Sequence, residues 1–212
     1  MDVITAVRKE KRTFYLTVND SETVKIPSAI MRERPMTEGT EFDLEEYDQW
    51  LMVRQYRFAL DRAVGYLAAR PCSAKEIYDK LIRAGYRPCT CDMVLYKLRK
   101  EKLLNDEEFA LQWAEIRARH RLGPQRIRQE LRRKGISEEQ TQLAIEALDE
   151  DEQLQSAITL VKKGLLRAKK DEEPRKTAAR LAAMLARRGY GWETAKKAIA
   201  AAINNEEVEF DE

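Results

Sequence analysis

Positive charge is concentrated in one stretch of this sequence, from Arg117 to Gly135. Eight of its side chains are basic and one, Glu130, is acidic. On a helix Glu130 can pair with Arg126 or Lys134 at four-residue spacing, so the pattern predicts that most of the other cations have no carboxylate partner. Such a surface suits a polyanion or an acidic protein groove; the plainer alternative is a solvated helix face. The basic residues are Arg117, Arg119, Arg121, Arg126, Arg128, Arg132, Arg133 and Lys134.

Few side chains could hold a metal or act as a nucleophile. The cysteines are Cys72, Cys89 and Cys91, and His120 is the single histidine. The Cys-x-Cys spacing is short, and no second cysteine or histidine pair completes four ligands, so we expect no metal site. His120 lies among arginines, which oppose its protonation, and no nucleophile accompanies it. Without paired carboxylates or a glycine-rich phosphate loop, the sequence predicts a protein that is not an enzyme and has no cofactor.

The composition predicts a soluble, helical protein. Of 212 residues, 43% are hydrophobic and 36% are charged, and residues that favour helices are abundant. The net charge of +2 is unevenly distributed: residues 1–53 carry −4, residues 54–148 carry +7 and residues 149–212 carry −1. No apolar run approaches the roughly 20 residues that cross a bilayer, and no leader follows Met1. The odd number of cysteines indicates reduced thiols, so we expect a cytoplasmic protein without membrane contact.

The first 50 residues differ from the rest in being rich in β-branched and aromatic residues. Segments 3–7, 12–18 and 23–26 have the composition of strands, and a turn at 19–21 separates the last two. We expect a short helical turn from 28 to 34 and a final strand near 41–44. The sequence therefore predicts a small antiparallel unit at the N-terminus.

Beyond residue 47 the apolar residues recur at the three- and four-residue spacing of helices. Ser73 with Glu76 has the spacing of a capping box, and Gly85 suits the left-handed position that ends a helix. Residues 205–212 are acidic and are expected to be frayed. The buried faces are predicted to include Met93, Ile116 and Leu143. Helices are expected over about 48 or 55 to 69, 73–84, 88–98, 105–122, 124–134, 137–148, 154–165, 174–188 and 195–203.

A sequence pattern recurs three times at the expected helix ends. Segments 81–86, 131–136 and 185–190 all read Leu-x-Arg-x-Gly followed by an apolar residue, at spacings of 50 and 54 residues. The next apolar pair follows nine or ten residues after each glycine. Such a period predicts three stacked three-helix units. The expected domains are 1–53, a β-rich segment, then helical repeats over 54–104, 105–149 and 150–212, the last including the acidic tail.

Two runs in the second repeat resemble the RecX family of RecA regulators. They are Leu-Asn-Asp-Glu-Glu-Phe-Ala at 104–110 and Gly-Pro-Gln-Arg-Ile-Arg-Gln-Glu-Leu-Arg-Arg-Lys-Gly-Ile at 123–136. Segment 73–98 also fits the family's Ser…Glu-Ile…Leu…Gly pattern. The resemblance covers about 56–204 and weakens in the third repeat, where Trp192 and an alanine-rich helix depart from the pattern.

The resemblance implies a mainly α fold, in which three tandem three-helix repeats form an elongated curved stack after a small β-containing segment. It also implies that this protein is a monomer and that it binds the RecA recombinase. RecA would be bound either as a monomer or as a filament on DNA, in the groove of that filament. Such binding would inhibit RecA's ATPase, strand exchange and recombinase activity. The expected RecA and DNA contacts are the eight basic residues of the 117–134 stretch, with secondary candidates in the other repeats at Arg83, Arg87, Arg187 and Arg188.

A stand-alone DNA-binding helical module is the alternative, because short helices joined at glycine turns look similar to helix-turn-helix units. Such a module should bind duplex DNA by itself with a steep salt dependence. A RecA regulator should act at concentrations at which DNA alone binds it weakly.

Overall fold

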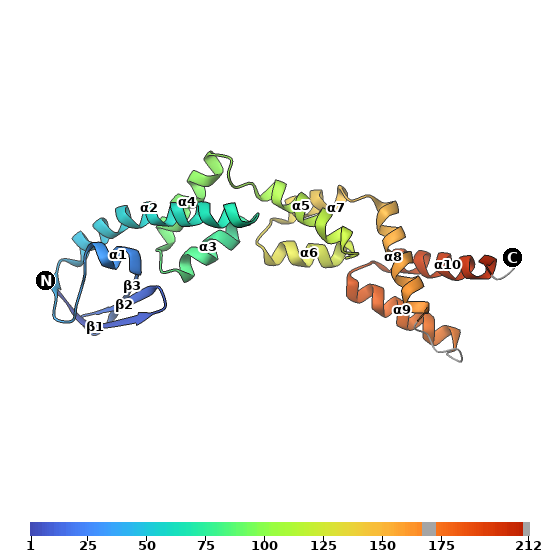
Figure 1. Ribbon diagram of the computed structural model, residues 1–212, viewed down its shortest axis with the longest axis horizontal. Coiled ribbons are helices and arrows are strands. Elements are labelled where there is room, and N and C mark those ends of the chain that lie inside the picture. Colours follow the sequence, from blue (N-terminus) through green and yellow to red (C-terminus); the bar gives the residue numbers. More distant parts are fainter. Residues whose placement is uncertain (167–172, 210–212) are drawn as a thin grey trace. The chain divides into compact units, whose positions relative to one another are not determined.

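The computed structural model describes residues 1–166 and 173–209 (Figure 1). Within these residues the chain forms ten helices and four strands, and it divides into two compact units, Met1–Asn105 and Asp106–Glu212. The expected fold class is confirmed: the protein is mainly helical, with three-helix groups that follow a small N-terminal antiparallel sheet.

The N-terminal sheet has the strand order β3-β2-β1-β4. Its strands are antiparallel, and β-branched residues occupy most of the inward positions. Helix α1 (Ser28–Glu33) covers the sheet, and Ile4, Leu16, Ile26 and Ile30 are fully buried or nearly so in the core that they share. The strands are β1 (Asp2–Glu10), β2 (Thr13–Val18), β3 (Glu22–Pro27) and β4 (Glu41–Phe42).

Helix α2 (Leu44–Ala69) belongs to two cores. Its first half buries Tyr47 and Leu51 against the sheet, and its second half buries Ala59 and Ala63 in the first helical group. The helix begins earlier than the sequence indicates, because the Asp43 side chain accepts the N–H of residue 46 at 3.0 Å and caps it.

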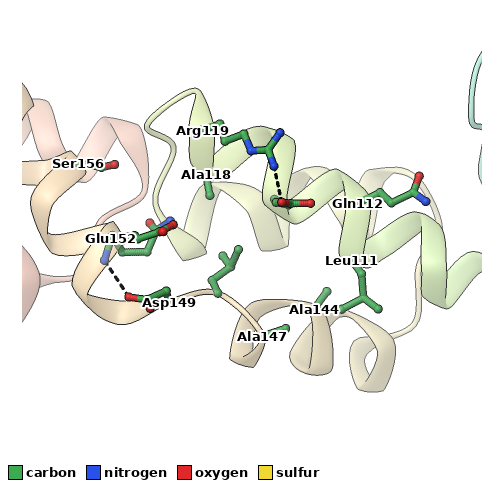
Figure 2. A pocket seen from close by; sticks show the side chains of 12 residues that line it. Leu111, Gln112, Ala118, Arg119, Ala144, Ala147, Asp149, Glu152 and Ser156 are labelled. Atoms are coloured by element: carbon green, nitrogen blue, oxygen red, sulfur yellow. Dashed lines mark hydrogen bonds and ion pairs between the residues drawn. The ribbon is translucent and has the colours of Figure 1, made fainter.

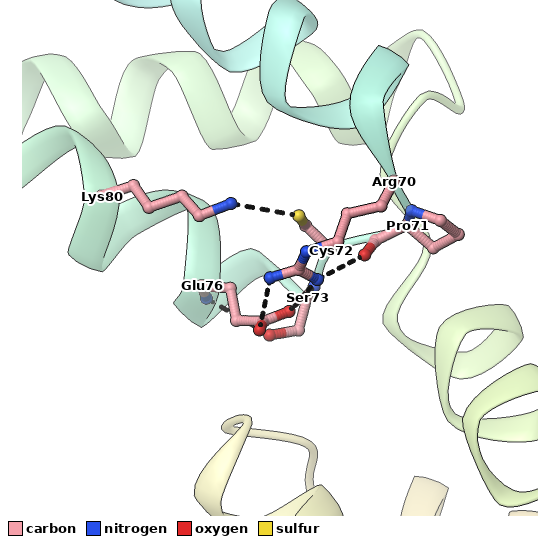
Figure 3. Close-up of polar contacts among 6 residues, drawn as sticks. All are labelled: Arg70, Pro71, Cys72, Ser73, Glu76 and Lys80. Carbon is pink, nitrogen blue, oxygen red and sulfur yellow. Dashed lines mark hydrogen bonds and ion pairs between the residues drawn. The ribbon is translucent and has the colours of Figure 1, made fainter. Parts of the chain in front are cut away.

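The first three-helix group is completed by α3 (Ala74–Arg83) and α4 (Pro88–Lys100). The capping box is confirmed: the Glu76 N–H donates to Ser73 Oγ and the Ser73 N–H donates to Glu76 Oε2, each at 3.2 Å (Figure 3). Arg70 also pairs with Glu76 at 3.1 Å. At the other end of α3, Gly85 has a φ of +93° and ends the helix as the sequence predicts.

The second unit contains two further helical groups. Phe109, Ile127 and Leu131 form the core of the first group, and Val161 and Leu181 lie in the core of the second. Helix α10 extends through the part of the tail that was expected to be frayed, and 210–212 lie outside the described residues. The helices are α5 (Asp106–Arg119), α6 (Pro124–Arg133), α7 (Glu138–Glu146), α8 (Glu150–Leu165), α9 (Pro174–Arg188) and α10 (Trp192–Glu209).

Two backbone turns join these two groups. The Gly123 N–H donates to the Arg188 carbonyl at 2.9 Å, and the Gln125 N–H donates to the Gly189 carbonyl at 3.0 Å. A Cβ atom on Gly123 would lie 2.5 Å from the carbonyl carbon and oxygen of Gly189, which is too close for any side chain. The glycines therefore allow the turn before α6 to contact the turn after α9 directly.

Three residues predicted to be buried are exposed. Met93, Ile116 and Leu143 have exposed fractions of 48%, 47% and 49%. Successive helix positions are rotated by about 100°. Met93 and Leu143 therefore lie beside the buried stripes that Val94 and Ala144 occupy. A three-helix group buries a narrower face than the apolar pattern alone suggests.

Gly135 offers a direct test of the predicted helix end after α6. Its φ is +78°, a conformation that strains a β-branched residue. Replacing Gly135 with valine should lower the free energy of unfolding by about 1–2 kcal/mol. Urea denaturation followed by circular dichroism measures this, and an unchanged midpoint would contradict the assignment.

Within the part of the chain that the structure describes, no helix combines the length and the apolar character needed to span a membrane.

Candidate partner and nucleic-acid interface

The 117–134 stretch comprises the end of α5, a turn and α6. Its centre is Glu130, whose side chain is 14% exposed. Glu130 accepts hydrogen bonds from Arg117 Nε at 2.6 Å and from Trp113 Nε1 at 3.2 Å, and Arg126 lies 3.8 Å away. The Arg117 guanidinium and the Lys134 ammonium also lie over the Trp113 ring, at 4.6 and 3.9 Å from its centroid. This cluster fixes the side chains between α5 and α6.

The expectation that most of these cations lack a carboxylate partner is wrong. Arg117 and Arg126 pair with Glu130, and Arg119 pairs with Glu115. The next helix contributes Glu138, which pairs with both Arg128 and Arg132. Of these pairs, Arg126–Glu130 is the four-residue pair that the sequence predicts, and Arg119–Glu115 is another on α5 whose carboxylate lies just before the stretch. The other three pairs join different helices, so a spacing rule for one helix does not find them.

The surface nevertheless keeps an excess of positive charge. Five of its cations pair with only three carboxylates, those of Glu115, Glu130 and Glu138. The side chains of Arg119 and Arg132 remain 73% and 70% exposed. Exposed ion pairs contribute about 0–1 kcal/mol each, so a partner can replace such contacts at little cost. In the described portion of the chain, Arg121 and Arg133 form no ion pair.

The secondary candidates have different surroundings. Arg83 is exposed and its Nε donates to the Asp79 carbonyl at 3.0 Å. Arg87 instead makes a two-pronged contact with Asp48, at 2.5 and 2.6 Å, that ties α4 to α2. Its side chain is 27% exposed, and its guanidinium N–H groups stabilise the packing of these two elements.

Arg187 and Arg188 lie at the end of α9, in the same unit as the 117–134 stretch, and both are exposed. Arg188 Nη1 donates to the His120 carbonyl at 3.4 Å, which brings this side chain beside the turn between α5 and α6. The third group therefore contributes a cation next to the surface of the second.

A cavity of about 480 Å³ lies between α5, α7 and α8 (Figure 2). Leu111, Ala144 and other apolar groups form much of its wall. Its polar groups have structural roles: Asp149 caps α8 by accepting the Glu152 N–H at 2.9 Å, and Glu115 pairs with Arg119. The lining contains no histidine or cysteine and one serine, Ser156, so the cavity does not present a nucleophile beside a base.

The cysteines lie in different environments. Cys72 is buried, and Lys80 Nζ lies 3.5 Å from its sulfur (Figure 3). Cys91 is also buried, and burial raises the pKa of its thiol to about 12. Cys89 is exposed. Across the described ranges, no three His, Cys, Asp or Glu side chains are grouped to hold a metal ion.

These environments predict selective alkylation. Iodoacetamide should label Cys89 in the native protein at pH 8 and leave Cys91 unlabelled, because the buried thiol is both inaccessible and protonated below a pKa of about 12. Peptide mass spectrometry before and after denaturation measures the labelling at each site. Equal native labelling of the two cysteines would contradict the packing of α4.

The structure also brings together basic residues that the sequence analysis did not single out as a group. They come from the turn between β1 and β2 and from helices α2 and α3, and they line one open groove of the first unit. The one sequence feature that indicated this cluster is the adjacent pair Lys11-Arg12 in a turn between two strands. The other cations of the cluster lie 50 or more residues further along the sequence. The groove cations are Lys11, Arg12, Arg62, Lys80 and Arg83.

Comparison with known proteins gives a consistent set of similarities. Residues 59–98, 105–145 and 150–199 match the models for the first, second and third three-helix domains of RecX. The regulatory protein RecX of Mycobacterium sp. (strain KMS) is 38% identical over 130 residues, covering 58% of this chain and 70% of the relative. The regulatory protein RecX of Bacillus pumilus is 25% identical over 210 residues, covering 99% of this chain and 80% of the relative.

Two crystal structures share the fold. One, of a regulatory protein RecX, superposes with a TM-score of 0.65 at 21% identity, covering 92% of this chain and 98% of the other. The other, of RecX from Lactobacillus salivarius, has a TM-score of 0.66 at 20% identity and covers 71% and 97%. At this level of identity the likeness concerns the fold.

Proposed function

The chain belongs to the RecX family of regulatory proteins, and on that basis we propose that it regulates the RecA recombinase by binding it. The observation that carries this proposal is the succession of three RecX domain matches along one chain. The regulator binds RecA as a monomer or as a filament on DNA, in the cytoplasm, and acts itself as a monomer. It inhibits ATP hydrolysis, strand exchange and recombinase activity.

The proposed contact is the positive surface of the 117–134 stretch. A RecA filament on DNA presents phosphates and acidic side chains, and a surface with more cations than carboxylates is attracted to it. Arg119 and Arg132 are exposed enough to exchange their present partners for those of the filament. Arg121 and Arg133 have no ion pair to give up in the described chain. Arg188 extends the same surface, because its side chain donates a hydrogen bond to the His120 carbonyl.

Inhibition then follows from the presence of the bound protein on the RecA filament, and no covalent change of RecA is needed. A protein held along the filament obstructs the partner DNA strand and the subunit motions that accompany ATP hydrolysis. The relatives carry the name regulatory protein, which agrees with action by binding. Arg87 is set aside as a contact, because its guanidinium is committed to Asp48.

The test is the RecA ATPase on single-stranded DNA, titrated with this protein. We expect ATP hydrolysis to fall as the protein is added and the loss to persist when duplex DNA is in large excess. An unchanged ATPase would contradict the proposal. Relief of inhibition by excess duplex DNA would mean that duplex DNA binds the protein in place of RecA, and would favour the stand-alone DNA-binding module.

A further inference from the structure

The first unit contains a basic groove between the β1–β2 turn and helices α2 and α3. It has a volume of about 810 Å³ and is open to solvent. Lys11, Arg12 and Arg83 are exposed, whereas Arg62 and Lys80 are half-buried along its wall. The complete lining is Glu10, Lys11, Arg12, Thr13, Tyr15, Arg62, Tyr66, Lys80, Arg83 and Ala84.

The two sides of the groove are held together by a close backbone approach. Thr13 Oγ1 donates to the Ala84 carbonyl at 3.4 Å, joining β2 to the end of α3. A Cβ atom on Gly85 would lie 2.9 Å from Thr13 Cγ2, so glycine allows this contact. Lys11 has a φ of +54°, which turns the chain sharply from β1 into β2 at the rim. The groove is therefore part of the fold of this unit.

The charges of the groove are less neutralised than those of the 117–134 stretch. Its single carboxylate, on Glu10, pairs with Arg8 at 3.2 Å. Among the described residues, none of the five groove cations forms an ion pair with a carboxylate. In the 117–134 stretch, by contrast, Arg117, Arg119, Arg126, Arg128 and Arg132 do so. An anion that enters the groove therefore displaces no internal carboxylate.

Two aromatic rings lie among these cations. Tyr15 and Tyr66 are half-buried and both line the groove. Lys80 Nζ lies 4.7 Å from the centroid of the Tyr66 ring, and Arg8 lies 5.0 Å from that of Tyr15. Cations interleaved with accessible aromatic rings are the arrangement that binds single-stranded nucleic acids, because phosphates contact the cations and unpaired bases stack on the rings.

We propose that this groove binds single-stranded nucleic acid without RecA. The phosphates contact Lys11, Arg12 and Arg83, and bases stack beside Tyr15 and Tyr66. Paired bases cannot reach these rings, so single strands are preferred over duplex. The proposal goes beyond the regulation of RecA: it assigns to the N-terminal sheet a contact with the strand itself, at a surface separate in sequence from the 117–134 stretch.

The test uses the full chain and a fluorescein-labelled oligo-dT, with binding followed by fluorescence anisotropy. Replacing Lys11 with asparagine, which tolerates a positive φ, together with Arg12→Gln and Arg83→Gln should weaken binding at least tenfold. Three phosphate contacts give a slope of log K against log salt of about −2, and the triple variant should remove it. Tyr15→Thr, which suits a strand, should weaken binding about tenfold by removing one stacking ring.

The matched control is Lys75→Gln with Lys100→Gln and Lys102→Gln, three exposed cations of the same unit outside the groove. It changes the net charge as much as the triple variant and should leave binding within about twofold. Equal losses in the two variants, or equal affinity of the wild-type protein for duplex, would overturn the proposal. Displacement of the oligonucleotide by poly-glutamate at matched charge concentration would also overturn it, since the groove would then accept any polyanion.

A second measurement needs no variant. An oligonucleotide carrying 5-iodouracil, irradiated with the wild-type protein, should form crosslinks to Tyr15 or Tyr66, which peptide mass spectrometry locates. Crosslinks confined to peptides from residues 106–209, or the absence of any crosslink, would overturn the site. Because RecA is absent from both experiments, their failure would leave the RecA proposal to its own ATPase test.

Discussion

The variant in which Arg126, Arg128, Arg132 and Arg133 are replaced by glutamate is expected to lose inhibition of the RecA ATPase. Four reversals change the charge of α6 by −8, and like charges facing an anionic filament repel it. The concentration that gives half-maximal inhibition should rise at least about a hundredfold. The measurement is the same titration of RecA-dependent ATP hydrolysis on single-stranded DNA.

The matched control reverses Lys162, Lys163, Lys196 and Lys197, which are exposed on α8 and α10 of the same unit. It carries the same change of charge and should inhibit nearly as well as the wild type. Circular dichroism must show equal helical content in both variants, because Glu130 and Glu138 lose partners in the first one. Full inhibition by the α6 variant would remove this surface from the proposed contact.

Valine at Gly123 is expected to destabilise the second unit severely. The valine Cβ would overlap the carbonyl carbon and oxygen of Gly189. Hydrogen bonds between the two turns hold the backbone at Gly123 and at Gly189 in place. Neither turn can move away without breaking the bond from the Gly123 N–H to the Arg188 carbonyl, so we expect a loss of about 3 kcal/mol or more.

Urea denaturation measures the effect, with Gly191→Ala as the control. A Cβ on Gly191 would meet only the Gln125 side chain, at 3.9 Å, so this variant should change the free energy of unfolding by less than about 1 kcal/mol. Equal stability of the Gly123 variant and the wild type would contradict the contact between the two turns.

Local features were predictable from the sequence because the rules that govern them are local. The capping box at Ser73 and the positive φ at Gly85, Gly135 and Gly189 follow from residue type and position in a helix. The strands of the first 50 residues were identified from their composition for the same reason. The pattern Leu-x-Arg-x-Gly, which recurs three times, predicted the number of helical groups.

Features that depend on packing were not predictable in this way. Glu130 pairs most closely with Arg117, 13 residues earlier on another helix, and Glu138 accepts from cations of α6 although it begins α7. No spacing rule on one helix finds such partners. The groove of the first unit combines residues 11–15 with residues 62–84, and this neighbourhood exists only after the sheet and the helices pack.

The 26-residue helix α2 has a consequence for how the N-terminal region can vary. The sheet covers Tyr47 and Leu51, whereas α3 and α4 cover Ala59 and Ala63. Deleting the strands would therefore expose the apolar face of the N-terminal half of α2 to solvent. The region therefore cannot be trimmed like a loose appendage. Any shortened relative must either begin its first helix near residue 55 or supply a different cover for that side.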